Sequence, residues 1–373
     1  MLLEVYDKNT MDRVDIIHTF TFVQYTDYFN DVGTFSVTVP ITEKSLQYLM
    51  TVGNYILFEK LGDKFIMGVI EYFHSENISK PTVEIKGYMI SHILSYRCFK
   101  TTYRLRDKIF EIQRDFIQKN FINPTDVKRK ISLISLSDTY DTNTETVNYC
   151  NTGNNCSESI REMNEPYHYG FALVPVIEKY NPSTGRNQNI MGMVFEQYVP
   201  VDHTVGNTDG NDPVLFDTDL NNVENIMYEI DSTKSKTIAI VAGEDKGEDR
   251  KVIEVGDTEL TDINRNELYV DARDLQKEDE SGSEMTDEEY EEVLTERGTE
   301  KLKENSIDYA FEATVFTQTN NSFQYGIDYK NGDYVSVINR NLGMAVKVQI
   351  TGVTKSLTET GEILDLIFGN RIL

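Results

Sequence analysis

The sequence predicts an α+β fold that is mainly β, in which two related small β-barrels flank an inserted α+β region. Strand-forming residues are abundant, with 22 Tyr, 18 Phe and only 8 Pro among 373 residues, and aromatic and β-branched residues favour strands. Short runs alternate apolar and polar residues, as strands with one buried face do. A block near the start of the chain also reappears, in altered form, near its end.

Residues 1–100 are predicted to form the first barrel. The run 35–39, Phe-Ser-Val-Thr-Val, alternates in this way and is closed by Pro40. Short strands separated by glycine-containing turns are typical of small barrels and sandwiches. The other strands expected here span residues 55–58, 65–70 and 82–86.

Residues 101–202 are predicted to form the inserted α+β domain. Leu105, Ile109, Ile112 and Phe116 recur at spacings of three and four, which indicates a helix of about four turns. The polar stretch 137–159 is expected to be a loop, followed by a short helix over 157–163. Two strands should follow, at 169–179 and 191–199, around a turn at 181–185.

Residues 203–305 are predicted to complete the inserted and connecting region. After a polar loop over 203–222, strands are expected at 225–230, 237–241 and 250–255, with an acidic linker at 277–284. Thr286 with Glu289 forms a capping-box pattern at the start of a second helix. The apolar side of that helix comprises Tyr290, Val293, Leu294 and Leu302, and Gly298 weakens its interior.

Residues 306–373 are predicted to form the second barrel, because they repeat features of the first. A strand from Phe35 leads after 18 residues to Gly53-Asn54-Tyr55, and a strand from Phe311 leads after 21 residues to Gly332-Asp333-Tyr334. Farther on, Val69 precedes Gly87 by 18 residues, as Thr351 precedes Gly369. Agreement of order and spacing over four elements favours duplication, with the two Gly-[Asn/Asp]-Tyr steps as the repeat turns of the two barrels.

The formal charge of −26, from 62 acidic and 36 basic residues, argues against affinity-driven binding of nucleic acid. The acidity is concentrated in residues 244–300, where 22 Asp/Glu stand against 7 Lys/Arg. This segment is either a solvated acidic face or a surface that repels a polyanion.

The chain has three cysteines, Cys98, Cys150 and Cys156, and this odd number does not suggest a disulfide framework. With no secretion signal and no apolar run of about 18 residues, the sequence predicts a soluble protein made in a reducing cytoplasm.

The search for catalytic patterns predicts that the protein is not an enzyme and needs no cofactor or metal. No two of the five histidines have metal-ligand spacing, and His92 with Cys98 is best explained as ordinary core and surface residues. Residues 243–250 look like a hairpin turn, since acids crowd them and no Gly-Lys-Ser/Thr follows. Residues 217–221 begin like a calcium loop but continue with Asn222 and Tyr228, which excludes an EF-hand and leaves an irregular calcium site open. A carboxylate pair for glycoside cleavage also stays open.

The order of these features resembles the tail hub, or tail-associated structural protein, of long-tailed phages and related prophages. The segment 195–204 resembles the family pattern F-x-x-Y-x-G-x-D-R-T but has Pro200 and His203 in place of its Gly and Arg. The other segments that carry the resemblance are 29–40, 53–56, 67–71, 85–88, 94–97, 242–250, 269–275, 297–298 and 325–335.

This resemblance implies a fold related to the hub of T-even phages, with two similar barrels and an α+β insertion. It implies a baseplate hub at the distal end of the tail, in which three copies form a ring that joins the sixfold tail tube to the threefold tip and passes DNA during ejection. The implied partners are tail tube protein, distal tail protein and a tip or tape-measure protein, with DNA only as passing cargo and no membrane insertion. The implied location is the virion tail, after synthesis in the bacterial host cytoplasm. The alternatives are a receptor- or carbohydrate-binding module of the virion and a hydrolase.

Overall fold

The computed structural model describes residues 3–75, 82–178, 188–244, 250–277, 285–315, 323–340, 343–358 and 361–372. Its main feature is a 13-stranded sheet with the order β14-β18-β21-β20-β3-β4-β7-β6-β5-β1-β2, to which β19 and β13 are added beside β20. Almost all of its pairings are antiparallel. The mainly β prediction is therefore confirmed. Two separate closed barrels are not seen, because among the described strands no sheet closes on itself and the strands of both predicted barrels share this one sheet.

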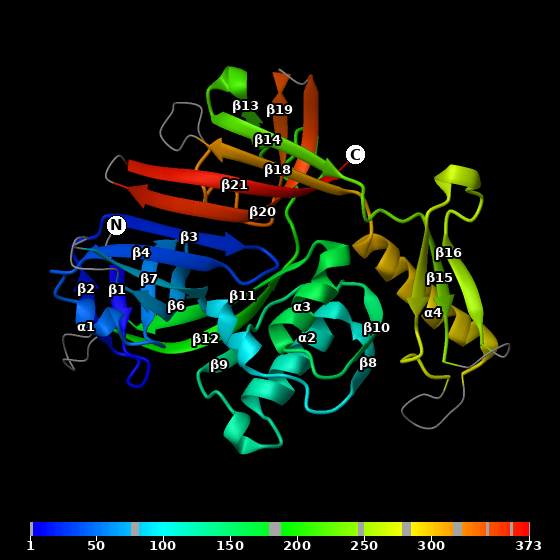
Figure 1. The fold of residues 1–373 in the computed structure, drawn as a ribbon, viewed down its shortest axis with the longest axis horizontal. Helices are drawn as coiled ribbons and strands as arrows, with labels where there is room; N and C mark the ends of the chain where they lie inside the picture. The colour runs from blue at the N-terminus through cyan, green and yellow to red at the C-terminus, as the bar shows by residue number, and fades with distance from the viewer. Residues whose placement is uncertain are drawn as a thin grey trace.

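The first half of the sheet contains the strands before residue 90 (Figure 1, blue). Apolar side chains at alternate positions, such as Phe35, Val37 and Val39, enter one buried cluster with Ile56 and Ile85, which is what a half-buried strand requires. Its elements are β1 (Leu3–Tyr6), β2 (Arg13–Ile17), β3 (Phe22–Tyr28), β4 (Thr34–Pro40), α1 (Leu46–Leu49), β5 (Tyr55–Leu61), β6 (Lys64–His74) and β7 (Thr82–Met89).

The second half of the sheet lies beside the first, joined to it by antiparallel pairing of β20 with β3 (Figure 1). It has a separate buried cluster that includes Val335, Val337, Ile350 and Leu366. Its elements are β13 (Leu215–Asp217), η5 (Thr218–Leu220), β14 (Val223–Asp231), β18 (Asp308–Val315), β19 (Tyr334–Asn339), β20 (Met344–Thr358) and β21 (Gly361–Ile372).

The region between β7 and β13 folds as an α+β layer around the largest buried cluster. The helix predicted from Leu105 is wrong in its first turns, because Tyr103–Lys108 is strand β8, paired with β10 in the stretch expected to be a loop. Only from Ile109 does the apolar spacing describe a helix. The elements are η1 (Ile90–Tyr96), β8, α2 (Ile109–Ile117), the π-helical η2 (Gln118–Ile122), η3 (Val127–Arg129), β9 (Ile134–Leu136), β10 (Thr146–Asn151), α3 (Cys156–Asn164), η4 (Glu165–Tyr167), β11 (Gly170–Glu178) and β12 (Asn189–Tyr198).

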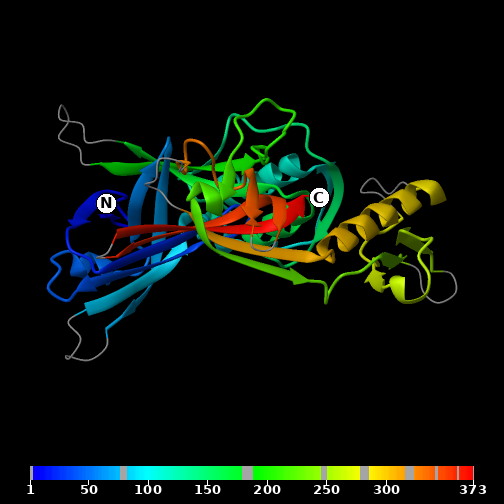
Figure 2. The same cartoon turned by 90° about the horizontal axis from the view of Figure 1, so that it is seen from above.

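A smaller unit is inserted between the paired strands β14 and β18, and projects to one side (Figure 2). It contains β15 (Ile238–Ala242), β16 (Val252–Gly256), η7 (Asp262–Asn264), β17 (Glu267–Asp271) and α4 (Asp287–Glu304), with α4 packed on the three strands. The predicted capping box is confirmed, since Thr286 and Glu289 bond each other's backbone. Gly298 allows close packing, because a Cβ there would lie 2.7 Å from a methyl of Val241.

The predicted domain boundaries stay a prediction, although the pairings bring β13 and β14 of range 203–305 into one sheet with strands of range 306–373. The predicted turn at 181–185, the centre of the 243–250 hairpin and most of the acidic linker lie outside the described residues. Over the described part of the chain, no helix is both long and apolar enough to cross a membrane.

Candidate functional site

The two predicted repeat turns have the same backbone hydrogen bonds. The Gly53 N–H donates to Ile70 O at 2.7 Å, and the Gly332 N–H donates to Ile350 O at 2.8 Å. In return, the N–H groups of the two isoleucines donate to the carbonyls of Asn54 and Asp333. Both glycines have positive φ, +90° and +101°, which residues with a Cβ rarely adopt. Tyr55 and Tyr334 then begin β5 and β19.

The strands around the turns also correspond. The order β4-β7-β6-β5 in the first half is matched by β18-β21-β20-β19 in the second. Phe35 and Ile70 both lie opposite Gly87, and Phe311 and Ile350 both lie opposite Phe368. By this register Gly87 corresponds to Phe368 and Val69 to Gln349. The sequence match of Gly87 with Gly369 is therefore wrong by one residue, and that of Val69 with Thr351 by two, because equal spacing along the chain does not fix the pairing register.

The side chains at the second turn position differ. The Asn54 amide is buried; its Nδ2 donates to Tyr48 O at 3.0 Å, and its Oδ1 accepts from Lys8 N at 3.1 Å. The Asp333 carboxylate accepts from Lys330 N at 2.7 Å and lies 3.7 Å from Nε2 of His203. Burial raises the pKa of Asp333 above its usual value. The second turn thus carries a titratable group where the first carries an amide.

The seam between β3 and β20 includes polar contacts between the halves. Thr26 and Thr354 bond through their hydroxyls at 2.9 Å, and Gln24 Nε2 donates to Ser356 Oγ at 3.0 Å.

Beside these pairs, Lys355 on β20 contacts Glu59 on β5 at 2.8 Å, and the Tyr25 hydroxyl donates to the same carboxylate. Burial opposes the charge of Lys355, but hydrogen bonds to Glu59 and Glu362 outweigh it and raise the pKa of Lys355. Sequence reasoning missed this group, because nothing local in the sequence signals a contact between residues 296 positions apart.

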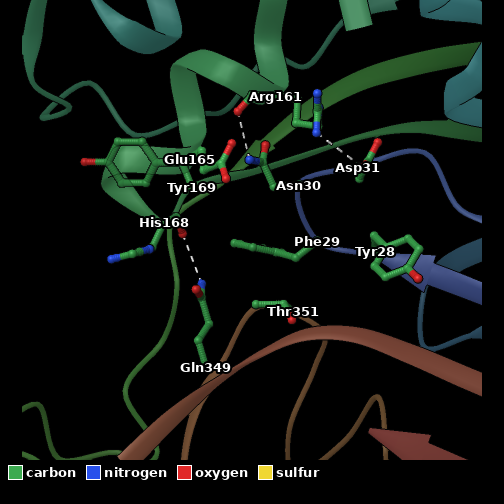
Figure 3. A pocket seen from close by; sticks show the side chains of 10 residues that line it. All are labelled: Tyr28, Phe29, Asn30, Asp31, Arg161, Glu165, His168, Tyr169, Gln349 and Thr351. Atoms are coloured by element: carbon green, nitrogen blue, oxygen red, sulfur yellow. Dashed lines mark hydrogen bonds and ion pairs between the residues drawn. The ribbon is translucent and has the colours of Figure 1, made fainter. Parts of the chain in front are cut away.

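A pocket of about 200 Å³ lies where the seam meets the inserted region (Figure 3). Asn30 Nδ2 donates to Arg161 O at 2.9 Å, and Gln349 Nε2 donates to His168 O at 3.0 Å. These bonds join the β3–β4 turn, the inserted region and β20 to one another, so the pocket marks a structural junction. Its lining residues are Tyr28, Phe29, Asn30, Asp31, Arg161, Glu165, His168, Tyr169, Gln349 and Thr351.

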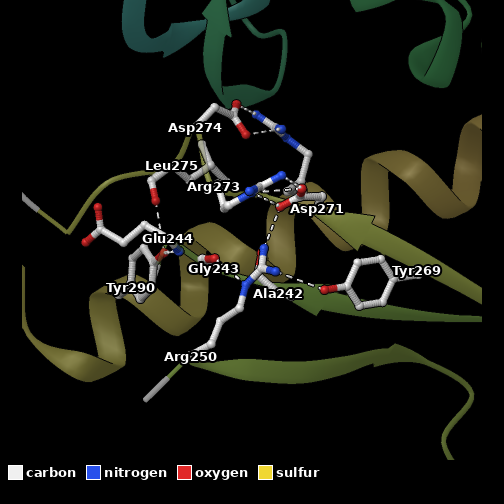
Figure 4. Close-up of polar contacts among 11 residues, drawn as sticks. Ala242, Gly243, Glu244, Arg250, Tyr269, Asp271, Arg273, Asp274, Leu275 and Tyr290 are labelled. Atoms are coloured by element: carbon white, nitrogen blue, oxygen red, sulfur yellow. Dashed lines mark hydrogen bonds and ion pairs between the residues drawn. The ribbon is translucent and has the colours of Figure 1, made fainter. Parts of the chain in front are cut away.

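Three of the segments that carry the family resemblance meet in the unit between β14 and β18 (Figure 4). Arg250 donates to the carbonyls of Ala242 and Gly243 at 2.8 and 2.7 Å, to the hydroxyl of Tyr269 at 3.0 Å, and to the carboxylate of Asp271. Its guanidinium thereby ties the end of β15 to β17.

The third segment joins this cluster from α4. Arg297 contacts Asp274 at 3.1 Å. The Tyr290 hydroxyl donates to Leu275 O at 2.9 Å (Figure 4). The hydroxyl of Tyr290 also accepts from Glu244 N at 2.9 Å. The described residues of these three segments therefore hold β15, β17 and α4 together.

The other candidate groups are engaged in ordinary contacts. Asp217 and Asp219, from the calcium-like stretch, both bind the guanidinium of Arg340 at 2.7 Å. His92 stacks on Tyr88 with ring centroids 4.3 Å apart, and Cys98 is exposed. Among the described residues, no group of three or more His, Cys, Asp or Glu is arranged to hold a metal ion.

Comparison with known proteins gives the family. The family model described as "Siphovirus ReqiPepy6 Gp37-like protein" matches residues 2–370. The chain belongs to this family. Together with the solved structures described next, this match confirms the resemblance to phage tail proteins. No curated protein matches the chain.

Solved structures of similar fold include phage and prophage tail proteins. The 43 kDa tail protein of prophage MuSo2 from Shewanella oneidensis matches this Gp37-like chain with a TM-score of 0.59 at 11% identity, over 99% of this chain and 98% of the other. A tail protein from Neisseria meningitidis MC58 gives 0.53 at 11%, over 99% and 96%. Prophage tail protein gp18 from Listeria monocytogenes EGD-e gives 0.51 at 15%, over 98% and 94%. These likenesses show a shared fold.

Proposed function

We propose that this Gp37-like protein is the baseplate hub at the distal end of the phage tail. Three copies form a ring that joins the sixfold tail tube to the threefold tip and lets DNA pass during ejection. The observation that carries this proposal is the duplicated strand order with equal register around Gly53 and Gly332. Three chains with two equivalent halves offer six similar docking units in the ring.

Such a ring needs a heterologous interface, in which each copy gives one surface and receives another. The partners are the tail tube protein, the distal tail protein and a tip or tape-measure protein, and the location is the virion tail after synthesis in the host cytoplasm. The role is structural, without catalysis or cofactor.

The acidic balance fits a passage for DNA. Acidic groups on the wall of a bore repel a polyanion within a Debye length of about 8 Å. We therefore expect the bore of the assembled ring to be acidic. A neutral or basic bore in an experimentally determined ring would contradict this placement.

The test is the mass of the purified full chain, alone and with tail tube protein. A trimer of about 129 kDa, three times 42.9 kDa, is expected by mass photometry or sedimentation, at least in the presence of tube protein. Labelled copies should then lie at the distal end of the tail in particle images. A chain that stays monomeric under both conditions contradicts the hub.

One observation favours the alternative of a carbohydrate-binding module. A groove of about 370 Å³ on the first half contains the exposed rings of Tyr72 and Tyr88 next to Glu71 and Lys86, and aromatic rings beside polar groups suit sugar binding. Specific binding on a glycan array that is lost in Tyr88→Ala would support this alternative.

A further inference from the structure

The seam inside the chain uses a strand edge that β19 leaves open. β20 pairs with β19 through residues 344–349 and with β3 through residues 352–358. β3 thus continues the sheet along the edge of β20 where β19 ends. Pairing along this edge joins the second half of the sheet to the first.

Each of the two strands that form this seam has an equivalent strand in the opposite half of the sheet. β6 corresponds to β20, since each has a bulge one residue after the isoleucine bonded to the repeat turn, at Glu71 and at Thr351. β14 corresponds to β3, since Tyr228 lies opposite Phe311 as Tyr25 lies opposite Phe35. The equivalent of the seam would therefore join β6 to β14.

Within one chain this second seam is not formed. β6 pairs with β5 only as far as Val69, and no described strand pairs with that edge of β6 farther on. β14 is the end strand of the described sheet. Both edges carry exposed apolar side chains, with Tyr72 47%, Met227 49% and Ile230 54% exposed. Open strand edges with exposed apolar residues favour pairing with another chain.

We propose that β14 of one copy pairs antiparallel with the open edge of β6 on the next copy, and so repeats the internal seam between chains. By the equivalence of positions, Tyr72 lies opposite Asp231 of the neighbour, and Phe73 lies opposite Ile230. The contact is heterologous, because each copy gives β14 and receives on β6, which is the kind of interface that closes a ring. This inference rests on the proposed hub, whose interface it defines.

The sizes of the side chains agree with this register. In the internal seam Gly352 leaves room for Tyr28, since a Cβ on Gly352 would lie 2.8 Å from the Tyr28 ring. In the proposed seam the large residue comes from the other strand, because Tyr72 takes the place of Gly352 and Asp231 that of Tyr28. Each pair thus combines one aromatic ring with a smaller residue.

The next pair on that face is polar in both seams. Thr354 and Thr26 bond at 2.9 Å in the internal seam. Their equivalents are His74 and Glu229 of the neighbour, an imidazole and a carboxylate that can form a hydrogen bond. Strand pairing supplies the backbone bonds, and these side chains fix the register.

Disulfide trapping in the full chain tests the register. The pair Tyr72→Cys and Asp231→Cys is introduced with Cys98→Ser, because Cys98 is exposed. Mild oxidation should link copies into covalent dimers and trimers on non-reducing gels. The control pair, Tyr72→Cys with Met227→Cys, moves one thiol four residues along β14, roughly 13 Å, and should give at least tenfold less product.

The outcomes separate this inference from the hub itself. If the unmodified chain is trimeric but the test pair links no better than the control pair, the proposed seam is wrong and the hub stands. If the chain is monomeric even with tube protein, both proposals fail. Hydrogen exchange of the unmodified chain gives a second measurement, which does not depend on how the variants fold. Assembly should slow exchange in peptides covering 70–74 and 227–231, and unchanged exchange in both contradicts the seam.

Discussion

The two halves of the sheet have the same backbone at the repeat turns but different surroundings. Gly53 faces the side chain of Lys8, whose Cδ would lie 2.9 Å from a Cβ on the glycine. Gly332 faces the ring of Phe29, which is buried between the seam and the inserted region. A Cβ on Gly332 would lie 2.1 Å from that ring. The duplicated backbone is kept in both halves, while only the second turn is built into the junction of the molecule.

The strongest test of this difference is alanine at each glycine. Gly332→Ala should lower the free energy of unfolding by about 3–5 kcal/mol, because a strained positive φ adds to overpacking against a buried ring. Gly53→Ala should cost about 1–2 kcal/mol, since the Lys8 side chain can move away. Urea unfolding measures both. Equal losses would show that the two turns have equivalent surroundings after all.

A second test removes the cation from the seam. Lys355→Met should destabilise the chain by about 2–4 kcal/mol. It removes the ammonium group, so that of these two partners of the partly buried Glu59 carboxylate only the Tyr25 hydroxyl remains. The double variant Lys355→Met/Glu59→Gln should recover at least half of this loss in a double-mutant cycle. The equivalent position after β6 is Ser75, so the pair belongs to the second half alone. Additive losses in the cycle would contradict the coupling.

The sequence was a good guide where local patterns decide the structure. The alternation around Phe35, the capping box at Thr286 and the two Gly-[Asn/Asp]-Tyr turns depend on a few neighbouring residues. It failed at Leu105, whose spacing fits a helix, because pairing of β8 with a strand some forty residues later decides the conformation there. The joining of both halves in one sheet depends on contacts such as that of Lys355 with Glu59, which no local pattern encodes.

A smaller effect should distinguish β3 from its equivalent β14. Burial raises the pKa of Asp27 on β3 to about 6, whereas β14 has Ile230 at that position. The folded chain therefore holds the proton of Asp27 more tightly than the unfolded chain, whose carboxyl titrates near 3.9. The contribution of Asp27 to stability falls as pH rises from about 4 to about 6.

Asp27→Asn should remove that fall and raise the free energy of unfolding at pH 7 by about 1–2 kcal/mol. Urea unfolding between pH 4 and pH 7 measures it. Asp231→Asn on β14 is the matched control, in which the pH dependence should have the opposite direction. Hydrogen bonds from Thr233 lower the pKa of Asp231, so the contribution of Asp231 to stability is lost as pH falls. A parallel change in both variants would contradict the assignment.

The smallest expected effect concerns the turns themselves. Asp333→Asn gives the second turn the residue type of the first, and the Asn Oδ1 can still accept from Lys330 N, as Asp333 does at 2.7 Å. Because burial raises the pKa of Asp333, the native carboxylate loses stability as pH rises through and above the usual carboxyl range. The amide does not, so the variant should gain up to about 1 kcal/mol at pH 7 and less at pH 4. Asp333→Ala, which removes the acceptor, should instead lose about 1 kcal/mol at both pH values. A different outcome would be a loss of stability in Asp333→Asn at pH 7 that disappears when His203→Gln is added. That result would show that the contact of His203 with Asp333 outweighs the burial of the carboxylate. The second turn would then be stabilised by an ionic contact, and the first by an amide.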